Sequence, residues 1–334
     1  MTNLKFTLLL IVITLFSGSV LAQDIKFNNP IAEQRADPWV FKADDGTYYF
    51  IATVPDYDKI VMRQAKTING LKTAEEKTVW TKHEKGIMGH HIWAPELHFI
   101  DGKWYIYFAA GEAEEIWKIR MYALSNTSKN PMEGTWKEEG QIKTKHDSFS
   151  LDATTFEHHG KHYMIWAQNV SPDSHATALV LSEMKNPTTL IGPEVVITQP
   201  EFSWERQKYN VNEGPAVLKK NGKIFVAYSA SATNHNYCLG LLWIDDDKNI
   251  LNADNWNKSP GPVFYTNDDL KRYGPGHNSF TVSEDGKTDV MIYHARDYKD
   301  IEGPELVDPN RATRAREIKW TPGGFPDFMQ NTGD

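Results

Sequence analysis

The sequence has almost no cysteine and no excess of positive charge. Its 334 residues include one cysteine, Cys238, so no disulfide can form within the chain, and we expect a small buried thiol and a fold held by packing. Asp and Glu outnumber Lys and Arg by 44 to 36, which argues against a nucleic-acid partner. Gly-x-Gly-x-x-Gly, Walker-type and His-Glu-x-x-His motifs are missing too. We therefore expect no cofactor to be required for the chemistry.

Long apolar runs are missing except near the N-terminus. Lys5 precedes a nearly uninterrupted apolar run from Phe6 to Phe16, and Val20-Leu21-Ala22 has the small residues of a cleavage site. The run is too short to span a bilayer. We therefore expect residues 1–22 to be a signal peptide that is removed. Residues 23–334 would then be exported, to the periplasm or the extracellular medium, with no membrane span.

The remaining chain is rich in short apolar-alternating segments that end in Gly or Asp-Gly turns, which is typical of β-hairpins. One hairpin pattern recurs five times around the turn glycines Gly46, Gly102, Gly160, Gly222 and Gly286. These glycines are 56, 58, 62 and 64 residues apart. A hairpin takes about 20 residues, and the remaining roughly 40 suffice for two further strands of a four-stranded blade.

Five such blades fill residues 23–334, so the expected fold is all-β, a single five-bladed β-propeller that forms the whole catalytic domain. A two-sheet sandwich is the alternative, because it also contains short strands at intervals. A sandwich does not, however, require the same hairpin at even spacing. We expect the stretch Arg316–Phe325 to help close the ring beside the N-terminal segment, which would remove an open sheet edge.

In a propeller, equivalent positions of all blades lie at the same height around the central axis. Counting back eight or nine residues from each turn glycine gives the start of each inner strand: Asp37, Trp93, Asp152, Glu213 and His277. Each carboxylate alone is compatible with a structural role in a turn. Three together predict a site, because glycoside hydrolysis uses one carboxyl to protonate the leaving oxygen and another to activate water or attack the sugar.

Aromatic and cationic residues near these strand starts are candidates for binding a sugar. The flat rings on which a sugar can lie are those of Trp39, Trp93, Phe149, Trp166 and Tyr209. Each can equally belong to the core, and Trp93 is the strongest candidate because it occupies a strand start. Arg296 can hydrogen-bond a sugar hydroxyl or keep a carboxylate ionised. His277 is a candidate for orienting a hydrated cation, such as calcium, in the channel.

Five stretches of the sequence resemble glycoside hydrolase family 43, across essentially all of residues 23–334. They are Arg-Ala-Asp-Pro-Trp-Val at 35–40, Ile-Trp-Ala-Pro-Glu-Leu at 92–97, Ser-Leu-Asp-Ala at 150–153, Asn-Glu-Gly-Pro-Ala at 212–216 and Gly-His-Asn-Ser-Phe at 276–280. The resemblance implies a five-bladed propeller that hydrolyses arabinose- or xylose-containing glycosides with inversion. It implies roles for five residues: Asp37 as general base, Glu213 as general acid, Asp152 as the group that positions the acid and adjusts its pKa, His277 beside an axial cation, commonly calcium, and Arg296 against the substrate.

Within the family, the last blade, from His-Asn-Ser-Phe at 277–280 to Asp-Pro-Asn-Arg at 308–311, resembles the exo-acting α-L-arabinofuranosidases. The expected substrates are arabinose-containing plant polysaccharides or oligosaccharides. A β-xylosidase or an endo-arabinanase is the alternative within the family. A non-catalytic carbohydrate-binding propeller, and a metal-dependent propeller lactonase or phosphotriesterase, are the alternatives from other classes. Loss of all activity on chelation, with the fold intact, would favour the metal-dependent enzyme.

Overall fold

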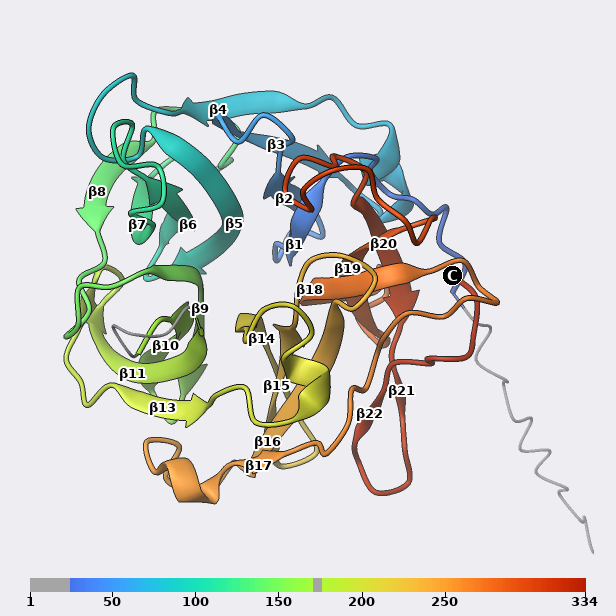
Figure 1. Ribbon diagram of the computed structural model, residues 1–334. Coiled ribbons are helices and arrows are strands. Elements are labelled where there is room, and N and C mark those ends of the chain that lie inside the picture. Colours follow the sequence, from blue (N-terminus) through green and yellow to red (C-terminus); the bar gives the residue numbers. More distant parts are fainter. Residues whose placement is uncertain (1–24, 171–175) are drawn as a thin grey trace, which may run out of the picture.

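The computed structural model describes residues 25–170 and 176–334, which form five antiparallel sheets around a central axis and one small hairpin (Figure 1). This is the all-β, five-bladed propeller that the repeat predicts. The predicted signal peptide, residues 1–22, lies outside the described residues.

Each blade takes its strands in chain order, starting from the strand nearest the axis. The first blade contains β1 (Ala36–Lys42), β2 (Tyr48–Thr53), β3 (Lys59–Ala65) and β4 (Lys77–Thr81), and the second contains β5 (His90–Ile100), β6 (Lys103–Gly111), β7 (Arg120–Asn126) and β8 (Lys137–Gln141). The third contains β9 (Ser150–His158), β10 (Lys161–Gln168) and β11 (Ala178–Asn186), with β12 (Thr189–Leu190) and β13 (Val195–Thr198) both paired to β11. The fourth contains β14 (Asn212–Lys220), β15 (Lys223–Ala230), β16 (Cys238–Asp245) and β17 (Asn257–Lys258), and the fifth contains β18 (Tyr273–Val282), β19 (Asp289–Arg296) and β20 (Ala312–Glu317).

The elements outside the blades are short. Three 3₁₀ turns, η1 (Asn69–Lys72), η2 (Ser203–Glu205) and η3 (Ala253–Asn255), lie in the connections between strands. The hairpin of β21 (Lys319–Trp320) and β22 (Pro326–Asp327) follows the last blade.

The core lies between neighbouring blades, because both faces of each middle strand are covered. Every residue of β2 and of β19 is buried, and Phe50 on β2 packs in one cluster with Val290 and Ile292 on β19. Cys238, at 4% exposure, is buried in the cluster that joins the third and fourth blades. Strands buried on both faces read as nearly continuous apolar runs, which is the pattern of the second strand in each sequence repeat.

The ring closes between the N-terminal segment and the fifth blade. Ala32 pairs antiparallel with Thr313 on β20, whose N–H donates to the Ala32 carbonyl at 2.8 Å. The Asn29 side chain extends this pairing, since it both donates to the Ala315 carbonyl and accepts from the Ala315 N–H, each at 2.8 Å. Chain segments almost 290 residues apart thereby share one sheet edge, which leaves the fifth blade covered.

The closing strand differs from the one expected. Closure uses β20 (Ala312–Glu317), whereas most of Arg316–Phe325 turns away into the β21–β22 hairpin. Phe325 packs edge-on against Phe225 at 5.5 Å and against Trp243 at 5.3 Å, both in the fourth blade. The hairpin therefore covers the outside of the ring and does not complete it.

A β-bulge interrupts every inner strand near its first residues. The register shifts fall between Ala36 and Trp39, Trp93 and Glu96, Leu151 and Thr154, Glu213 and Ala216, and Gly276 and Ser279. One residue of each bulge has a left-handed φ: Asp37 at 52°, Ala94 at 44°, Asp152 at 57°, Gly214 at 54° and His277 at 42°. The positions that are equivalent in the ring are therefore Ala94 and Gly214, one residue after the Trp93 and Glu213 of the sequence count.

The bulges tie the blades to one another around the axis. In four blades the N–H of the left-handed residue donates to a side chain of the preceding blade. These bonds run from Asp37 to His294 Nδ1 (3.0 Å), from Ala94 to Thr53 Oγ1 (2.8 Å), from Gly214 to Asp152 Oδ2 (3.0 Å) and from His277 to Ser229 Oγ (2.7 Å). Buried backbone groups that leave the strand ladder at a bulge find their partners in this way.

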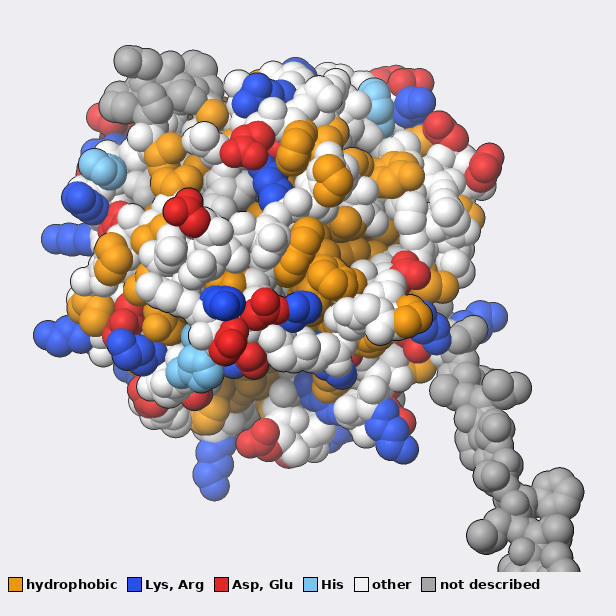
Figure 2. Space-filling model, turned by 90° about the horizontal axis from the view of Figure 1, so that it is seen from below, with side chains coloured by type: hydrophobic (Ala, Val, Ile, Leu, Met, Phe, Trp, Pro, Cys, Tyr) orange, Lys and Arg blue, Asp and Glu red, His pale blue; other side chains and the backbone are white. Residues whose placement is uncertain are grey.

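The face shown in Figure 2 carries Lys, Arg, Asp and Glu side chains interspersed with one another, and hydrophobic side chains gather in a hollow near its middle. Among residues 25–170 and 176–334, no helix is long and apolar enough to cross a membrane.

Candidate active site

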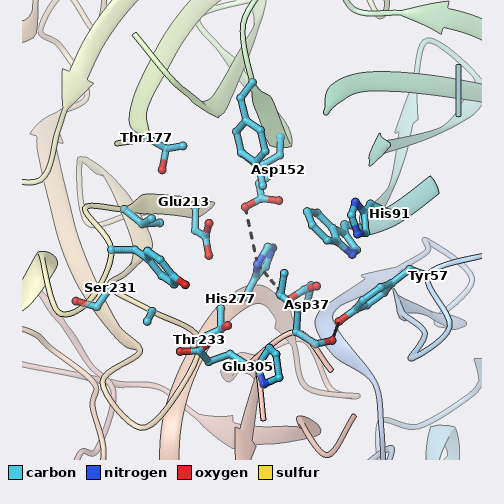
Figure 3. A pocket seen from close by; sticks show the side chains of 18 of the residues that line it. Asp37, Tyr57, His91, Asp152, Thr177, Glu213, Ser231, Thr233, His277 and Glu305 are labelled. Carbon is cyan, nitrogen blue, oxygen red and sulfur yellow. Dashed lines mark hydrogen bonds and ion pairs between the residues drawn. The ribbon is translucent and has the colours of Figure 1, made fainter. Parts of the chain in front are cut away.

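A pocket of about 800 Å³ lies where the inner strands begin, and all five blades contribute to its wall. The residues that line it include Asp37, Tyr57, His91, Trp93, Asp152, Glu213, His277, Glu305 and Arg311. Five of the predicted site residues are thus brought together: the three carboxyl groups, Trp93 and His277. Figure 3 shows Asp37, Asp152 and Glu213 arranged around His277.

Asp37 is surrounded by groups that stabilise its charged form. Its Oδ2 accepts a hydrogen bond from Thr53 Oγ1 at 2.6 Å, and its Oδ1 lies 3.3 Å from Arg311 Nη1 and 3.3 Å from His277 Nδ1. Burial by itself would raise the pKa of Asp37, but the Arg311 charge, two histidines and the Thr53 hydroxyl outweigh it and hold that pKa well below its ordinary value. Asp37 is therefore ionised at neutral pH and at moderately acidic pH.

His294 supports the backbone of Asp37. Its Nδ1 accepts the Asp37 N–H at 3.0 Å, so this nitrogen carries no proton. Burial, together with the nearby Arg311 charge, holds the pKa of His294 well below its ordinary value. The neutral ring lies parallel to the ring of Tyr237, with the centroids 5.6 Å apart and 2° between the planes. Tyr237 also contacts Glu213. The stacked rings of His294 and Tyr237 therefore connect the residue that holds Asp37 with the residue that holds Glu213.

Glu213 has the opposite electrostatic surroundings. Burial is the largest influence and the Asp37 charge adds to it, so the pKa of Glu213 is raised to about 7 although Tyr237 and Arg311 act in the lowering direction. The Tyr237 hydroxyl donates to Glu213 Oε1 at 2.7 Å. This bond leaves Oε2 to carry the proton. Glu213 is thus a carboxylic acid that can donate a proton near neutral pH.

Asp152 fixes the backbone next to Glu213. Its Oδ2 accepts the Gly214 N–H at 3.0 Å. Burial and the charges of Glu213 and Asp37 raise the pKa of Asp152 well above its ordinary value. The carboxyl groups of Asp152 and Glu213 therefore titrate as a coupled pair, and ionisation of one opposes ionisation of the other.

His277 lies between the carboxyl groups, with Nδ1 at 3.3 Å from Asp37 Oδ1 and 4.0 Å from Asp152 Oδ2. Burial lowers the pKa of His277. Gly214 leaves room for this ring, because a Cβ on Gly214 would lie 3.1 Å from His277 Cγ.

The calcium expected beside His277 stays a prediction. Within the described ranges, 25–170 and 176–334, no group of three or more His, Cys, Asp or Glu side chains is arranged to hold a metal ion. Calcium takes six to eight oxygen ligands, so waters would have to supply most of them beside His277, whose Nδ1 faces Asp37. No step of the chemistry below passes through a metal.

Trp93 belongs to a group of rings at one side of the pocket. It stacks on His91, with the centroids 4.3 Å apart and 29° between the planes, and Tyr57 meets it edge-on at 5.6 Å. His91 Nδ1 lies 2.9 Å from the Ile116 carbonyl, which holds this group against the next loop.

Three predicted substrate-binding residues do not line the pocket, which corrects the expectation. Trp166 is 0% exposed, and its Nε1 donates to Gln168 Oε1 at 2.8 Å within the core. Trp39 joins the first two blades, because its Nε1 donates to the Leu97 carbonyl at 2.8 Å.

Arg296 is the third of these residues, and it lies behind the pocket wall. Its Nε donates to Asp308 Oδ1 at 3.0 Å and its Nη1 to the Thr233 carbonyl at 2.8 Å. Its charge therefore holds the loop between β19 and β20 and is not free for a sugar.

Three functional groups escape prediction from sequence: Arg311, His294 and Tyr237. Arg311 and His294 occur in the Asp-Pro-Asn-Arg and Tyr-His-Ala-Arg stretches of the last blade, but nothing local marks them as partners of Asp37, more than 250 residues away. Tyr237 lies just before β16 in a segment without a motif.

Known proteins are similar to this chain in both sequence and fold. The family model described as glycosyl hydrolases family 43 matches residues 27–326. An extracellular exo-alpha-(1->5)-L-arabinofuranosidase of Streptomyces avermitilis is 55% identical over 304 residues, which are 91% of this chain. The chain spans 63% of the length of that relative. A protein of the same name from Streptomyces chartreusis is 53% identical over 83% of this chain and 84% of its own length.

Solved structures agree with these relatives. The alpha-L-arabinofuranosidase from Lactobacillus brevis is 46% identical and superimposes with a TM-score of 0.89, over 92% of this chain and 97% of that one. A thermostable family-43 glycoside hydrolase, 24% identical, has a TM-score of 0.76 over the same shares of the two chains and supports the fold alone. Since the family model spans nearly the whole propeller and relatives are more than half identical, the chain belongs to glycosyl hydrolase family 43.

Proposed function

We propose that this protein is an exported, inverting, exo-acting α-L-arabinofuranosidase that acts on arabinose-containing polysaccharides or oligosaccharides. One observation carries the proposal: a single pocket holds an ionised carboxylate, Asp37, and a carboxyl group, Glu213, whose pKa of about 7 leaves it partly protonated at neutral pH. These are the protonation states that a general base and a general acid need before the reaction begins.

Asp37 is the general base of this mechanism. A carboxylate has about four acceptor positions, so Asp37 can bind a water beside the contacts from Thr53 and Arg311. As the water oxygen attacks the anomeric carbon, its proton passes to Asp37. The Arg311 charge keeps Asp37 ionised beforehand and limits its basicity, so the attack depends on the positioning of the water as well as on proton transfer.

Glu213 is the general acid. Its proton passes to the glycosidic oxygen as the bond to the anomeric carbon breaks, so the leaving sugar departs as a neutral alcohol. Asp152 accepts a hydrogen bond from the neighbouring Gly214 N–H, and the Tyr237 hydroxyl donates one to Glu213 Oε1. These two bonds fix the orientation of the Glu213 carboxyl group and of the proton on its Oε2. Asp37 and Glu213 lie on two sides of His277, which suits a displacement with inversion (Figure 3).

The shape of the site favours removal of a terminal sugar. Residues of all five blades line the pocket, and Tyr57 of the first blade donates to the Leu306 carbonyl in the loop of the fifth blade at 2.7 Å. This bond joins two loops into one wall. A chain end fits into such a pocket more readily than the middle of a polymer, because a polymer needs two open sides.

The choice of arabinose, and of an exported protein, rests on the relatives. Those more than half identical are named extracellular exo-arabinofuranosidases. Solved structures titled xylan beta-1,4-xylosidase and endo-arabinase are 17% and 16% identical and support only the fold. The β-xylosidase and endo-arabinanase alternatives therefore have no comparable support. Calcium remains a prediction from the family resemblance.

The deciding experiment measures hydrolysis of an aryl α-L-arabinofuranoside and an aryl β-D-xylopyranoside by residues 23–334. We expect preferential release of arabinose, and proton NMR of the first product should show the inverted anomer before mutarotation. Asp37→Ala, which should lose activity on both aryl substrates, serves as the control for a contaminating activity. Faster xyloside hydrolysis would replace the assignment by β-xylosidase. No hydrolysis of either substrate or of arabino-oligosaccharides would favour a non-catalytic binding protein.

A further inference from the structure

The leaving-group side of the pocket can be located from the two carboxyl groups. This step rests on the proposed function, in which Glu213 protonates the leaving oxygen and Asp37 activates water on the opposite face of the sugar. The sugars beyond the broken bond must then extend from the Glu213 side. In Figure 3, Ser231, Thr233 and Thr177 lie on that side, whereas Tyr57 and His91 lie on the side of Asp37.

Tyr209 is an exposed ring that lines the pocket on the chain segment leading to Glu213. It precedes Glu213 by four residues, a span of at most about 14 Å in extended chain. Its exposure of 49% is high for a large aromatic residue beside a site whose acid, Glu213, is itself partly buried. A half-exposed tyrosine offers an apolar face with a polar rim, and a sugar ring pairs well with such a surface.

An ion pair fixes the segment that carries Tyr209. Lys208, with φ of 70°, forms a salt bridge to Glu305 in the loop between β19 and β20, and its Nζ lies 5.3 Å from the centre of the Tyr209 ring. Glu305 is fixed in turn, because Asn234 Nδ2 donates to its side chain at 3.4 Å and Arg296 Nη2 to its carbonyl at 3.2 Å. We call the Lys208–Glu305 pair the clasp. It joins a loop before the fourth blade to a loop of the fifth.

We propose that Tyr209, held by the clasp, is the platform for the sugar on the leaving-group side of the broken bond. The ligand class is an α-linked arabino-oligosaccharide or the end of an arabinan chain. Lys208 is a positioning residue in this proposal, because it acts through the ring of Tyr209.

The other exposed ring of the pocket is on the wrong side for this role. Trp117 is 57% exposed and lies 4.7 Å from the ring of His91, within the group formed by Trp93 and Tyr57. That group belongs to the Asp37 side, from which the water approaches (Figure 3). Trp117 therefore provides the competing hypothesis, and both rings can be tested in the same way.

The experiment compares two substrates that differ only beyond the broken bond. The kcat/KM for α-1,5-linked arabinotriose is divided by that for an aryl α-L-arabinofuranoside, for wild type, Tyr209→Ala, Trp117→Ala and the control Tyr265→Ala. Tyr265 has a similar exposure of 44% and does not line the pocket. We expect Tyr209→Ala to lower this ratio about tenfold, through KM for the trisaccharide. Tyr265→Ala should keep the wild-type ratio.

The clasp is tested with Lys208→Met, which keeps the length of the side chain and removes its charge. We expect KM for arabinotriose to rise about threefold, with partial recovery in Lys208→Arg. A drop of the ratio in Trp117→Ala with no drop in Tyr209→Ala would overturn the assignment, as would equal ratios in all variants. A wild type inactive on both substrates would instead remove the proposed function, so the two failures are distinct.

Discussion

At the scale of single residues, Asp37 and Glu213 differ mainly in the charged groups that surround them. Asp37 is buried and Glu213 is partly buried, yet the pKa of Asp37 is held well below its ordinary value and that of Glu213 is raised to about 7. The Arg311 side chain lies 3.3 Å from Asp37, whereas Glu213 receives only the hydroxyl of Tyr237. The Arg311 charge, the two histidines and the Thr53 hydroxyl together hold Asp37 ionised, whereas burial and the Asp37 charge outweigh the lowering influences on Glu213.

The two roles predict different dependence on the leaving group. Glu213→Ala should lose about 10²- to 10⁴-fold in kcat/KM on an arabino-oligosaccharide, but much less on an aryl arabinofuranoside whose leaving group needs little protonation. Asp37→Ala should lose activity on both, because the attacking water needs its base in either case. Steady-state kinetics with both substrates checks this, and small, equal losses in the two variants would contradict the roles.

The hydrogen bond from Tyr237 predicts a shift in the pH profile. Activity requires protonated Glu213, so kcat/KM should fall as pH rises through about 7. The Tyr237 hydroxyl stabilises the ionised form and lowers this pKa, so Tyr237→Phe should move the alkaline limb upward by about one pH unit. The kcat/KM profile between pH 5 and 9 measures the shift. A downward shift would mean that the hydroxyl instead stabilises the protonated acid.

The raised pKa of Glu213 also affects stability. Folding favours the protonated form, so this contribution is complete below pH 4.5, the ordinary pKa, and is lost as pH rises through about 7. The full difference corresponds to about 3 kcal/mol. Glu213→Gln should therefore gain stability relative to wild type between pH 5 and pH 8. Urea unfolding at the two pH values tests this, and a difference independent of pH would contradict it.

The sequence predicts the site residues that lie at strand starts and misses their partners. Asp37, Asp152 and Glu213 stand at fixed distances from turn glycines, so the repeat alone brings them to one axis. Arg311 comes from a loop without a repeat, and only the closed ring places it beside Asp37. The sequence cannot separate Trp166 from a ligand platform, because an aromatic residue that packs between two blades has the same local pattern as one that faces a ligand.

At the scale of the elements, the inner-strand bulge is the feature that the repeat does not reveal. The hairpins can be predicted from alternation and turn glycines, but the extra residue in each inner strand shifts the register by one at Trp93 and Glu213. The residues that follow three of the left-handed positions are Pro38, Pro95 and Pro215, which lack an N–H for the strand ladder. This proline is the only local sign of the bulge.

The closing segment can be tested by removing one side chain. Asn29 makes two hydrogen bonds to the backbone of Ala315, so Asn29→Ala should lower the free energy of unfolding by about 1 to 3 kcal/mol. The exposed neighbour Asn28 provides the matched control, since Asn28→Ala should change it by less than about 0.5 kcal/mol. Chemical denaturation of the three proteins measures the difference. Equal effects of the two substitutions would show that the closure is not held by Asn29.

At the scale of the whole molecule, the enclosed pocket predicts the product pattern. If only a chain end enters, the enzyme should release monomeric arabinose from linear arabinan from the first turnover. The viscosity of the polymer should then fall little while reducing ends increase. Chromatography of the early products, together with viscometry, measures both quantities. Early oligosaccharides with a steep fall in viscosity would indicate an open groove and endo action.

The single buried cysteine can report how often the fourth blade separates from its neighbour. Cys238 lies at the start of β16 between two blades, and burial raises the pKa of its thiol to about 12, so the folded protein presents almost no reactive thiolate. A thiol reagent can therefore modify the protein only while the fourth blade separates from its neighbour. Because no second cysteine competes for the label, the rate of modification gives the frequency of that separation directly.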